Sequence, residues 1–485
     1  MKILQVASEV TPFAKTGGLA DVTAALPKEL RRMGHDVRVA IPFYKGASSG
    51  GHPVRKARKS AEVQLGGELH KGYLRQTTLG DVPVYLVENR DFFGRNYLYG
   101  PPEGDYPDNP LRFAFFCRSV LQLLKRMDFR PDVIHCHDWQ AALIPIILKY
   151  ELGDDPFFNR MALVFTIHNL AYQGLFPADC LPQTGLDDSL FTMDLLEYYG
   201  RLNLMKGAII ASDAITTVSE TYCREILTPG QGCGLEGVLG ARRADLTGIL
   251  NGLDTEEWSP SSDRRIFRNY STKSLAGKGA DKLDLQRELG LKVDPSVPLI
   301  GMVGRIVEQK GIDIVIELLP RFAEENVQLV ILGTGDLQLM HQLYEFRNSG
   351  IAKNVSINLG FKDPLAPRIY AGCDMFLMPS RYEPCGLSQL IALSYGAVPI
   401  VRRTGGLADT VVDVADAPRE GNGFSFSDYS AESCWETVQR ALAFYRDREG
   451  WRKIMRRGML RDVSWRNAAH KYEELYGACF EKKRG

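Results

Sequence analysis

Two cations stand close together after an apolar run in the second half of the sequence. The run from Pro298 to Val303 predicts a buried strand, and Arg305 and Lys310 follow it. Open α/β sheets bind ligands at the carboxyl ends of their strands. A guanidinium presents a planar fork of donors and an ammonium a mobile point charge, so the pair suits a pyrophosphate. The alternative is that both are solvated surface cations, which is the usual location of Lys and Arg.

A carboxylate follows another apolar run in the same half. Glu383 comes after the strand predicted at residues 375–378 and before a glycine-containing turn, Cys385, Gly386 and Leu387, that leads into a helix. At such a strand end the carboxylate can accept hydrogen bonds from sugar hydroxyls. The alternative is an acid that interacts with the dipole at a helix start. The position at the rim of the sheet favours the sugar.

The sequence contains no two aspartates two residues apart, so the D-x-D motif that holds a metal on a diphosphate is absent. If a nucleoside diphosphate leaves, side chains and helix N-termini must meet its developing charge. Two Gly-Gly turns can add backbone amides, because glycine has no Cβ to obstruct a phosphate. Both turns belong to one hexapeptide, Thr-Gly-Gly-Leu-Ala-Asp, at residues 16–21 and 404–409. The plainest interpretation is a shared phosphate-facing turn.

Histidines cluster in the first half of the chain. His135 and His137 flank the end of a predicted strand, Asp138 follows them, and His168 comes directly after the strand predicted at residues 162–167. No second cluster completes a ligand set with zinc spacing, so we predict no metal and no cofactor. His168 fits a hydrogen-bonding group over a ligand. A buried histidine satisfied within the core is the alternative.

Short apolar runs separated by helical stretches predict two series of β-α-β units, each implying a parallel sheet. The strands of the first series are predicted at residues 2–7, 36–42, 82–87, 133–136, 162–167 and 214–218, and those of the second at 298–303, 327–332, 355–359, 375–378 and 397–401. The helix between residues 19 and 33 is predicted as two pieces because Pro27 should kink it.

These series predict an α/β protein with two Rossmann-like, doubly wound domains, at residues 1–248 and 249–464. The C-terminal segment, residues 465–485, is amphipathic at helical spacing from Trp465 to Phe480. This helix is expected either to cap a core or to cross back and tie the two domains together.

Composition limits the partners. The 485 residues exceed what one core usually supports, which also favours two domains. Lys plus Arg and Asp plus Glu each total 59, and this balance argues against nucleic acid or an anionic membrane as the main partner. Nine cysteines without a C-x-x-C pair fit reduced thiols. The sequence shows neither a signal peptide nor an apolar stretch long enough to span a bilayer, so we expect a cytoplasmic protein.

Six motifs, in order along the chain, resemble those of the bacterial glycogen synthases and plant starch synthases. They lie at residues 15–19, 137–139, 168–174, 251–252, 304–311 and 383–387. The resemblance implies a glycosyltransferase-B fold, in which two facing Rossmann-like domains form the active-site cleft and a C-terminal helix crosses back. It also implies retaining transfer of glucose from ADP-glucose to the non-reducing end of an α-1,4-glucan such as glycogen.

The resemblance also assigns roles by position. Arg305 and Lys310 would neutralise the leaving diphosphate, while Lys15 and Gly18 approach it from the other domain. His168 would lie over the reacting sugar, and Glu383 would contact its hydroxyls. Phe361 would stack on the adenine, and Glu9, Asp21 and Asp138 would line the acceptor side. The other implied substrate contacts are Asn169, Asn251 and the turn of Cys385, Gly386 and Leu387. Because no nucleophile is evident, front-face attack is expected, with the leaving phosphate taking the acceptor proton.

Other functions remain open at this stage. A related retaining transferase could use UDP-glucose or another acceptor, although Ile391, where many such enzymes carry a second glutamate, favours the glycogen and starch synthases. A protein that binds glucan without turnover is disfavoured, because it has no need for a set of four charged residues spread over two domains: Lys15, Arg305, Lys310 and Glu383. A nicotinamide dehydrogenase should show G-x-G-x-x-G after the first strand, and residues 8–15 do not. The oligomeric state is open.

Overall fold

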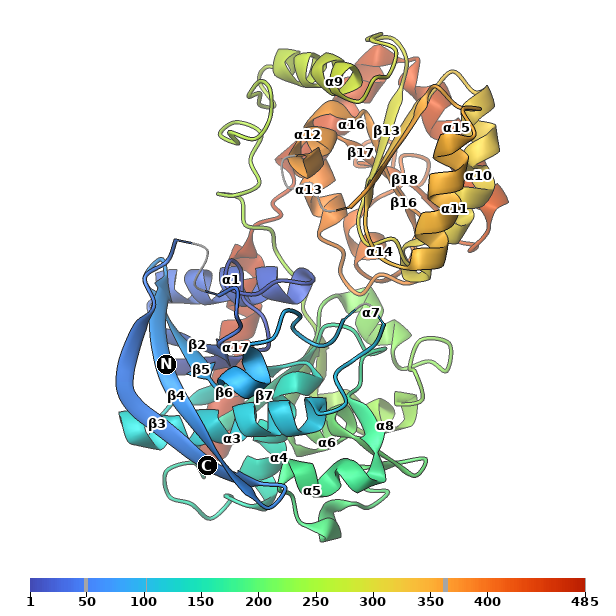
Figure 1. Cartoon of the computed structure of the whole chain (residues 1–485). Helices are drawn as coiled ribbons and strands as arrows, with labels where there is room; N and C mark the ends of the chain where they lie inside the picture. Colours follow the sequence, from blue (N-terminus) through green and yellow to red (C-terminus); the bar gives the residue numbers. More distant parts are fainter. Residues whose placement is uncertain (48–50, 102, 361–364, 485) are drawn as a thin grey trace. The chain divides into compact units, whose positions relative to one another are not determined.

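The computed structural model describes residues 1–47, 51–101, 103–360 and 365–484. The chain forms two compact units, one made of Met1–Gly252 with Trp465–Gly485 and the other of Leu253–Ser464 (Figure 1). Each unit is an α/β fold around its own sheet. In the described part of the chain, no helix has the length and apolar character needed to cross a membrane.

The first unit contains a nine-stranded sheet in the order β12-β11-β7-β6-β1-β2-β5-β4-β3. Its parallel strands are β1 (Lys2–Val6), β2 (Asp36–Pro42), β5 (Val82–Glu88), β6 (Val133–His137), β7 (Ala162–Ile167), β11 (Ala214–Thr217) and β12 (Leu246–Gly248). Chain order runs outward in both directions from β1 and β6. The sheet therefore has its topological switch point between these two strands, where such folds bind ligands.

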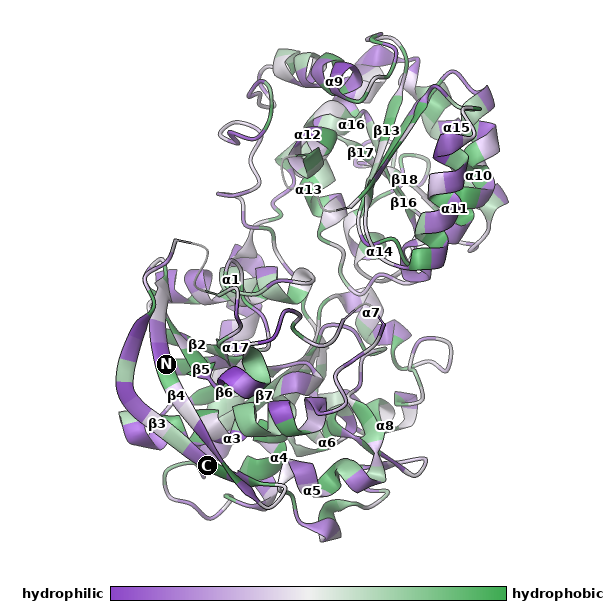
Figure 2. Cartoon of the chain, in the orientation of Figure 1, coloured by the Kyte–Doolittle hydropathy of each residue, from purple (hydrophilic) through white to green (hydrophobic). Residues whose placement is uncertain are grey.

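Two strands of this sheet are not parallel, which corrects the prediction of an all-parallel sheet. The hairpin of β3 (Arg55–Leu65) and β4 (Glu68–Leu79) continues the sheet antiparallel from β5. Only the second half of β3 is buried, at Ala61, Val63 and Leu65. Most of the other residues of β3 are hydrophilic (Figure 2). The charged start of β3 lies at the sheet edge, where Lys and Arg oppose pairing with another chain.

Helices cover the faces of this sheet. They are α1 (Gly18–Arg32), α2 (Arg90–Phe93), α3 (Asn109–Met127), α4 (Leu143–Tyr150), α5 (Leu181–Thr184), α6 (Leu204–Ala211), α7 (Glu220–Glu225) and α8 (Glu236–Ala241). A small separate sheet joins β8 (Leu175–Pro177), β10 (Arg201–Asn203) and β9 (Glu197–Tyr198).

Helix α1 is a single helix, so the prediction of two pieces separated at Pro27 is wrong. Proline in a helix removes one hydrogen bond and introduces a clash, a penalty of about 3 kcal/mol. Here Val22, Leu26 and Leu30 on the same helix are almost fully buried in one apolar cluster. Burying each such side chain is worth about 1.5–3 kcal/mol, so packing outweighs the proline penalty.

The last helix, α17 (Trp465–Arg484), belongs to the first unit although it follows the second in sequence. Its buried residues Trp465, Tyr472 and Tyr476 share an apolar cluster with Ile3 of β1 and Leu26 of α1. The prediction that the C-terminal helix crosses back is therefore confirmed, and the helix covers the core at the same time.

The second unit contains a six-stranded, wholly parallel sheet in the order β15-β14-β13-β16-β17-β18. Its strands are β13 (Leu299–Val303), β14 (Gln328–Gly333), β15 (Val355–Leu359), β16 (Met375–Met378), β17 (Val398–Arg402) and β18 (Phe424–Phe426). Its helices are α9 (Ala276–Glu288), α10 (Ile312–Glu324), α11 (Leu337–Asn348), α12 (Leu365–Gly372), α13 (Ser388–Ser394), α14 (Gly405–Thr410), α15 (Ala431–Tyr445) and α16 (Arg448–Leu460). The switch point of this sheet lies between β13 and β16.

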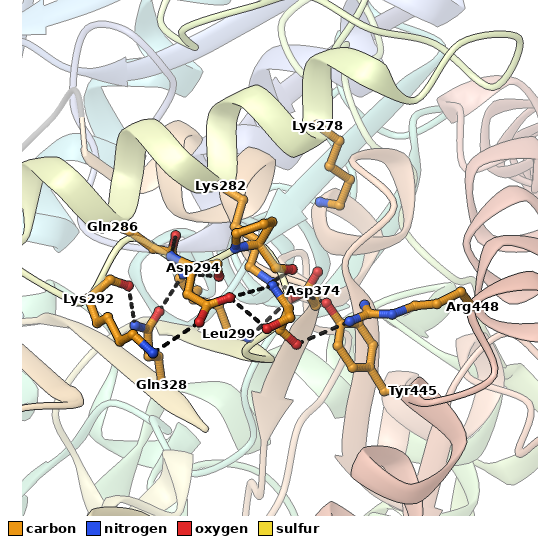
Figure 3. A network of polar contacts seen from close by, with 12 residues as sticks. Lys278, Lys282, Gln286, Lys292, Asp294, Leu299, Gln328, Asp374, Tyr445 and Arg448 are labelled. Atoms are coloured by element: carbon orange, nitrogen blue, oxygen red, sulfur yellow. Dashed lines mark hydrogen bonds and ion pairs between the residues drawn. The ribbon is translucent and has the colours of Figure 1, made fainter. Parts of the chain in front are cut away.

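A buried polar network holds the residues at the amino ends of β13 and β16 (Figure 3). Lys282 of α9 donates to Asp374 Oδ2 at 2.7 Å and to the Pro295 carbonyl at 3.1 Å. Asp374 in turn accepts the Leu299 backbone N–H at 2.9 Å. Lys278, one turn earlier on α9, donates to two carbonyls at the end of α12, and burial lowers the pKa of this lysine. The amino ends of the two central strands are thus held together.

Candidate active site

The predicted cations of the second unit lie in the loop that follows β13. The backbone N–H of Ile306 bonds to Thr334 after β14, and a short 3-10 turn, Glu308–Lys310, leads to Gly311. Gly311 has φ +73°, and a Cβ there would lie 2.1 Å from the Pro379 carbonyl oxygen. Only glycine allows this close approach. The approach brings the Lys310 loop against the end of β16.

Lys310 and Glu383 form one group with Ser380. Lys310 Nζ lies 2.9 and 2.6 Å from the two carboxylate oxygens of Glu383, and Ser380 Oγ donates to Oε2 at 3.0 Å. Glu383 is only 4% exposed, so its carboxylate is fixed in orientation by these donors. Ser380 was not predicted; its position two residues after the strand run 375–378 is the signal that could have identified it.

Arg305 is exposed and lies beside this group. Its Nη2 donates to Gln309 Oε1 at 3.2 Å, and Gln309 Nε2 donates to the Tyr382 carbonyl at 3.4 Å. A small cavity opens at the switch point between β13 and β16, and its lining is Met302, Val303, Gly304, Lys310, Leu377, Met378, Ser380 and Ser388. Cations, a fixed carboxylate and a cavity therefore meet at the strand ends, where the sequence predicted them.

The second copy of the repeated hexapeptide supports the Glu383 loop. Gly406 N–H donates to the Glu383 carbonyl at 3.0 Å. A Cβ on Gly405 would lie 1.9 Å from that carbonyl oxygen, and one on Gly406 would lie 1.9 Å from the Cys385 carbonyl oxygen. Both glycines are thus explained by packing against the loop rather than by an open phosphate site. The loop ends in Gly386, at φ +72°, and Leu387 precedes α13.

The first copy is held differently, by Glu9. The Glu9 carboxylate accepts the Thr16 N–H at 2.5 Å and the Thr16 hydroxyl at 2.6 Å, and Tyr99 donates to it at 2.6 Å. Glu9 is 3% exposed, so in this structure it serves the loop and Tyr99. No described atom lies within 4 Å of a Cβ added to Gly17. This turn, unlike the second copy, leaves space for a ligand.

Lys15 and Asp21 form an ion pair beside this turn, with Nζ 2.6 Å from Oδ1. The lysine side chain is 47% exposed and the aspartate side chain 27% exposed, so water screens the pair and its contribution to stability is small. Gly18 is the first residue of α1. The free amides of the helix start, with Lys15 nearby, are suited to an anion.

Polar groups also gather after β6 and β7. Asp138 has φ +56° and ψ 179°, a region essentially reserved for glycine, and such strain recurs at functional sites. Its Oδ1 accepts the His168 backbone N–H at 2.8 Å. Burial raises the Asp138 pKa to about 7, although backbone hydrogen bonds from His168 and Asn169 oppose the shift. Asn169 itself accepts the Ala171 N–H at 3.1 Å.

His135 and His137 lie on β6, and His168 directly follows the adjacent strand β7. His137 Nδ1 is 3.0 Å from His168 Nε2, and His135 bonds to Tyr476 and Thr166. Burial lowers the pKa of His135 and of His168 to about 3, and that of His137 well below its usual value. The histidines are therefore uncharged near neutral pH. Among the residues that the structure describes, no group of three His, Cys, Asp or Glu side chains is placed to hold a metal ion.

The remaining predicted contacts are Asn251 and Phe361. Asn251 is 5% exposed, and its Oδ1 is buried without a hydrogen-bond partner in the described part of the chain. An unsatisfied buried carbonyl of this kind is uncommon, and it could accept a hydrogen bond from a donor group on a ligand. Phe361 lies outside the described residues.

Comparisons with known proteins identify the family of the chain. Residues 2–241 match the starch synthase catalytic domain family, and residues 287–457 match the glycosyl transferases group 1 family. The chain is 83% identical to glycogen synthase 2 of Geobacter metallireducens and 71% identical to glycogen synthase 2 of Geobacter sulfurreducens, in each case over all of both chains.

Among solved structures, the catalytic domain of starch synthase IV from Arabidopsis thaliana, bound to ADP and acarbose, superposes with a TM-score of 0.93 at 34% identity, covering 99% of each chain. A sucrose-phosphate synthase from Thermosynechococcus elongatus, with a TM-score of 0.61 at 16% identity and 99% coverage of each chain, shares the fold. These likenesses agree with the glycosyltransferase-B fold expected from the sequence motifs. With strand-end cations and a fixed carboxylate in the second unit, and 83% and 71% identity to two glycogen synthases over the full length, the chain belongs to the glycogen synthase family of glycosyltransferases.

Proposed function

We propose that the protein transfers glucose from ADP-glucose to the non-reducing end of an α-1,4-glucan such as glycogen, with retention of configuration and release of ADP. The observation that carries the proposal is the group Lys310, Glu383 and Ser380 at the switch point of the second sheet, with Arg305 beside it. The starch synthase relative was solved with ADP and acarbose, which supports a nucleotide and a glucan as ligands.

In this proposal the second unit, Leu253–Ser464, binds the donor. Arg305 and Lys310 neutralise the charge that develops on the diphosphate as its bond to the anomeric carbon breaks. Glu383, already oriented by Lys310 and Ser380, accepts hydrogen bonds from the glucose hydroxyls. The turn Cys385, Gly386 and Leu387 adds backbone N–H groups at the start of α13.

The first unit, whose main part is Met1–Gly252, supplies the acceptor side and part of the phosphate contact. Lys15 and Gly18 offer an ammonium and the start of α1 to the phosphates. Asp138, Asn169 and Asn251 contribute polar groups, and His168 lies over the sugar. Glu9 and Asp21 act from the acceptor side, with Glu9 also holding the loop at Thr16. The crossing helix, residues 465–485, completes this unit.

The acceptor hydroxyl attacks the anomeric carbon from the face that the diphosphate leaves. The new bond joins the anomeric carbon to the glucan oxygen, the bond to the diphosphate oxygen breaks, and the acceptor proton passes to the leaving phosphate. No dedicated protein base is then required. Nine free cysteines, most of them buried, fit the reducing cytoplasm, where we expect the enzyme to act.

The test is incorporation of labelled glucose into added glycogen, with ADP-glucose and UDP-glucose offered separately and chelator present. We expect incorporation from ADP-glucose, in a product that an α-1,4-specific hydrolase degrades. Preference for UDP-glucose would retain the reaction and reassign the donor. A folded sample that incorporates neither would refute the proposal.

A further inference from the structure

His137 is a buried histidine to which the proposed reaction gives no role. It ends β6, is fully buried, and lies one residue before Asp138. Its Nδ1 is 3.0 Å from His168 Nε2, and the two ring centroids are 5.2 Å apart. On its other side the ring of His135 lies at a centroid distance of 4.0 Å. His137 is thus placed between the core and the histidine that is expected to face the sugar.

The hydrogen bond between the two rings contains a single proton. Burial is the main cause that holds the pKa of both histidines far below neutrality, and each ring therefore carries one N–H. The other titratable groups nearby do not protonate the pair. His135 is itself uncharged and bonded to Tyr476 and Thr166, and Asp138 accepts the backbone N–H of His168.

The remaining nitrogen of His137 decides where that proton lies. His137 Nε2 is buried and has no hydrogen-bond partner in the described part of the chain. A proton on Nε2 would be an orphaned buried N–H, which is rarer in native proteins than an acceptor left unsatisfied. The proton of His137 is therefore on Nδ1 and is donated to His168 Nε2. His168 must then carry its own proton on Nδ1.

We propose that His137 is a positioning residue that holds His168 as an Nδ1–H donor for a hydroxyl oxygen of the sugar substrate. His168 is more exposed than His137, and no described residue is bonded to its Nδ1. A neutral ring fixed in this form donates a hydrogen bond and does not accept the acceptor proton. The inference rests on the proposed function only in naming a sugar as the ligand of His168.

The first measurement is the tautomer of His168 in the full chain, observed by ¹⁵N NMR on histidine-labelled protein. The chain has eight histidines, and the signal of His168 is assigned by its loss in His168→Gln. We expect the proton on Nδ1. A proton on Nε2 in the wild-type protein would overturn the inference, whether or not any variant folds.

The second measurement uses two substitutions of His137. His137→Phe keeps a ring but removes the donor, and we expect a mixture of His168 tautomers and a kcat about 10- to 100-fold lower, with a smaller change in KM. In His137→Asn the amide nitrogen occupies nearly the place of Nδ1. That variant should restore the Nδ1–H form and come within about threefold of the wild-type kcat, the effect of weakening one hydrogen bond.

His135→Phe is the matched control, because it removes an equally buried histidine that bonds to Tyr476 and Thr166 instead. It should lower stability and leave the His168 tautomer unchanged. A folded His137→Phe with wild-type kcat and an unchanged tautomer would refute the positioning role. Absence of transfer by the wild-type enzyme would refute the proposed function instead, since the tautomer is measured without turnover.

Discussion

Alanine at Gly406 tests how the active-site loop of the second unit is supported. The added Cβ would lie 1.9 Å from the Cys385 carbonyl oxygen. Favourable C–H···O contacts in proteins have C···O distances of about 3.3 Å or more, so the loop must retreat by about 1.4 Å to reach such a contact. Overpacking of this kind lowers the free energy of unfolding by about 1–3 kcal/mol. A displacement of about 1 Å at a reacting centre can lower the rate about 100-fold, so kcat/KM should fall by about that factor.

The matched control is Gly17→Ala in the first copy of the same hexapeptide. No described atom lies within 4 Å of the added Cβ, and Gly17 has extended backbone, with φ −155°. Alanine at this helix N-cap should change the free energy of unfolding by about 1 kcal/mol or less. If phosphate approaches this turn, the added methyl raises KM for ADP-glucose.

Urea unfolding and initial rates of glucose incorporation measure both effects. Support of the active-site loop by close packing at Gly406 is refuted if Gly406→Ala unfolds at the wild-type urea concentration and keeps wild-type kcat/KM. It is also refuted if the two variants lose stability to the same degree, because the space around the two glycines would then not be what distinguishes them.

Three other predictions concern the charged groups. Lys310→Ala should lower kcat about 100- to 1000-fold in the incorporation assay, because one donor to the developing charge on the diphosphate is lost. Glu383 also loses one of its two side-chain donors and keeps Ser380. A loss of kcat below tenfold would contradict the role of Lys310. The Asp138 pKa is raised from 3.8 to about 7, so the folded state holds this proton more tightly and the free energy of unfolding should fall as pH rises from about 4 to 7. Asp138→Asn should remove this decline in urea titrations, and an unchanged profile would argue against the shift. Excess chelator should leave the rate unchanged, and a rate restored only by a divalent cation would show that side chains alone do not stabilise the diphosphate.

The sequence predicted the parallel strands well, because strands buried on both faces read as continuous apolar runs. Every strand predicted in the two series is present, several with the same bounds. The hairpin of β3 and β4 was missed because its charged, exposed residues interrupt the apolar signal. The alternation of Ala61, Val63 and Leu65 could have indicated part of it. The break at Pro27 was predicted from local preference, which tertiary packing overrode.

The location of the candidate site was predictable and its internal contacts were not. Strand ends indicated Arg305, Lys310 and Glu383, because doubly wound sheets bind ligands there. The partners, however, are far apart in sequence: Lys310 and Glu383 are separated by 73 residues, and Glu9 and Tyr99 by 90. Which side chains meet depends on strand order and loop geometry. Glu9 was predicted by resemblance as an acceptor contact, and only the structure reveals its bonds to the loop at Thr16.

The repeated hexapeptide illustrates why identical residues need not have identical roles. In the first copy the helix starts at the second glycine, Gly18, and a carboxylate from β1's loop, Glu9, holds the backbone before it. In the second copy the helix starts at the first glycine, Gly405, and no space remains for a Cβ because the Glu383 loop lies against it. In the second copy the neighbouring backbone requires glycine, whereas in the first copy the space beside Gly17 can admit a ligand. Since local sequence is the same, the difference comes from what the rest of each fold places beside the turn, and a motif therefore indicates a function only once its neighbours are known.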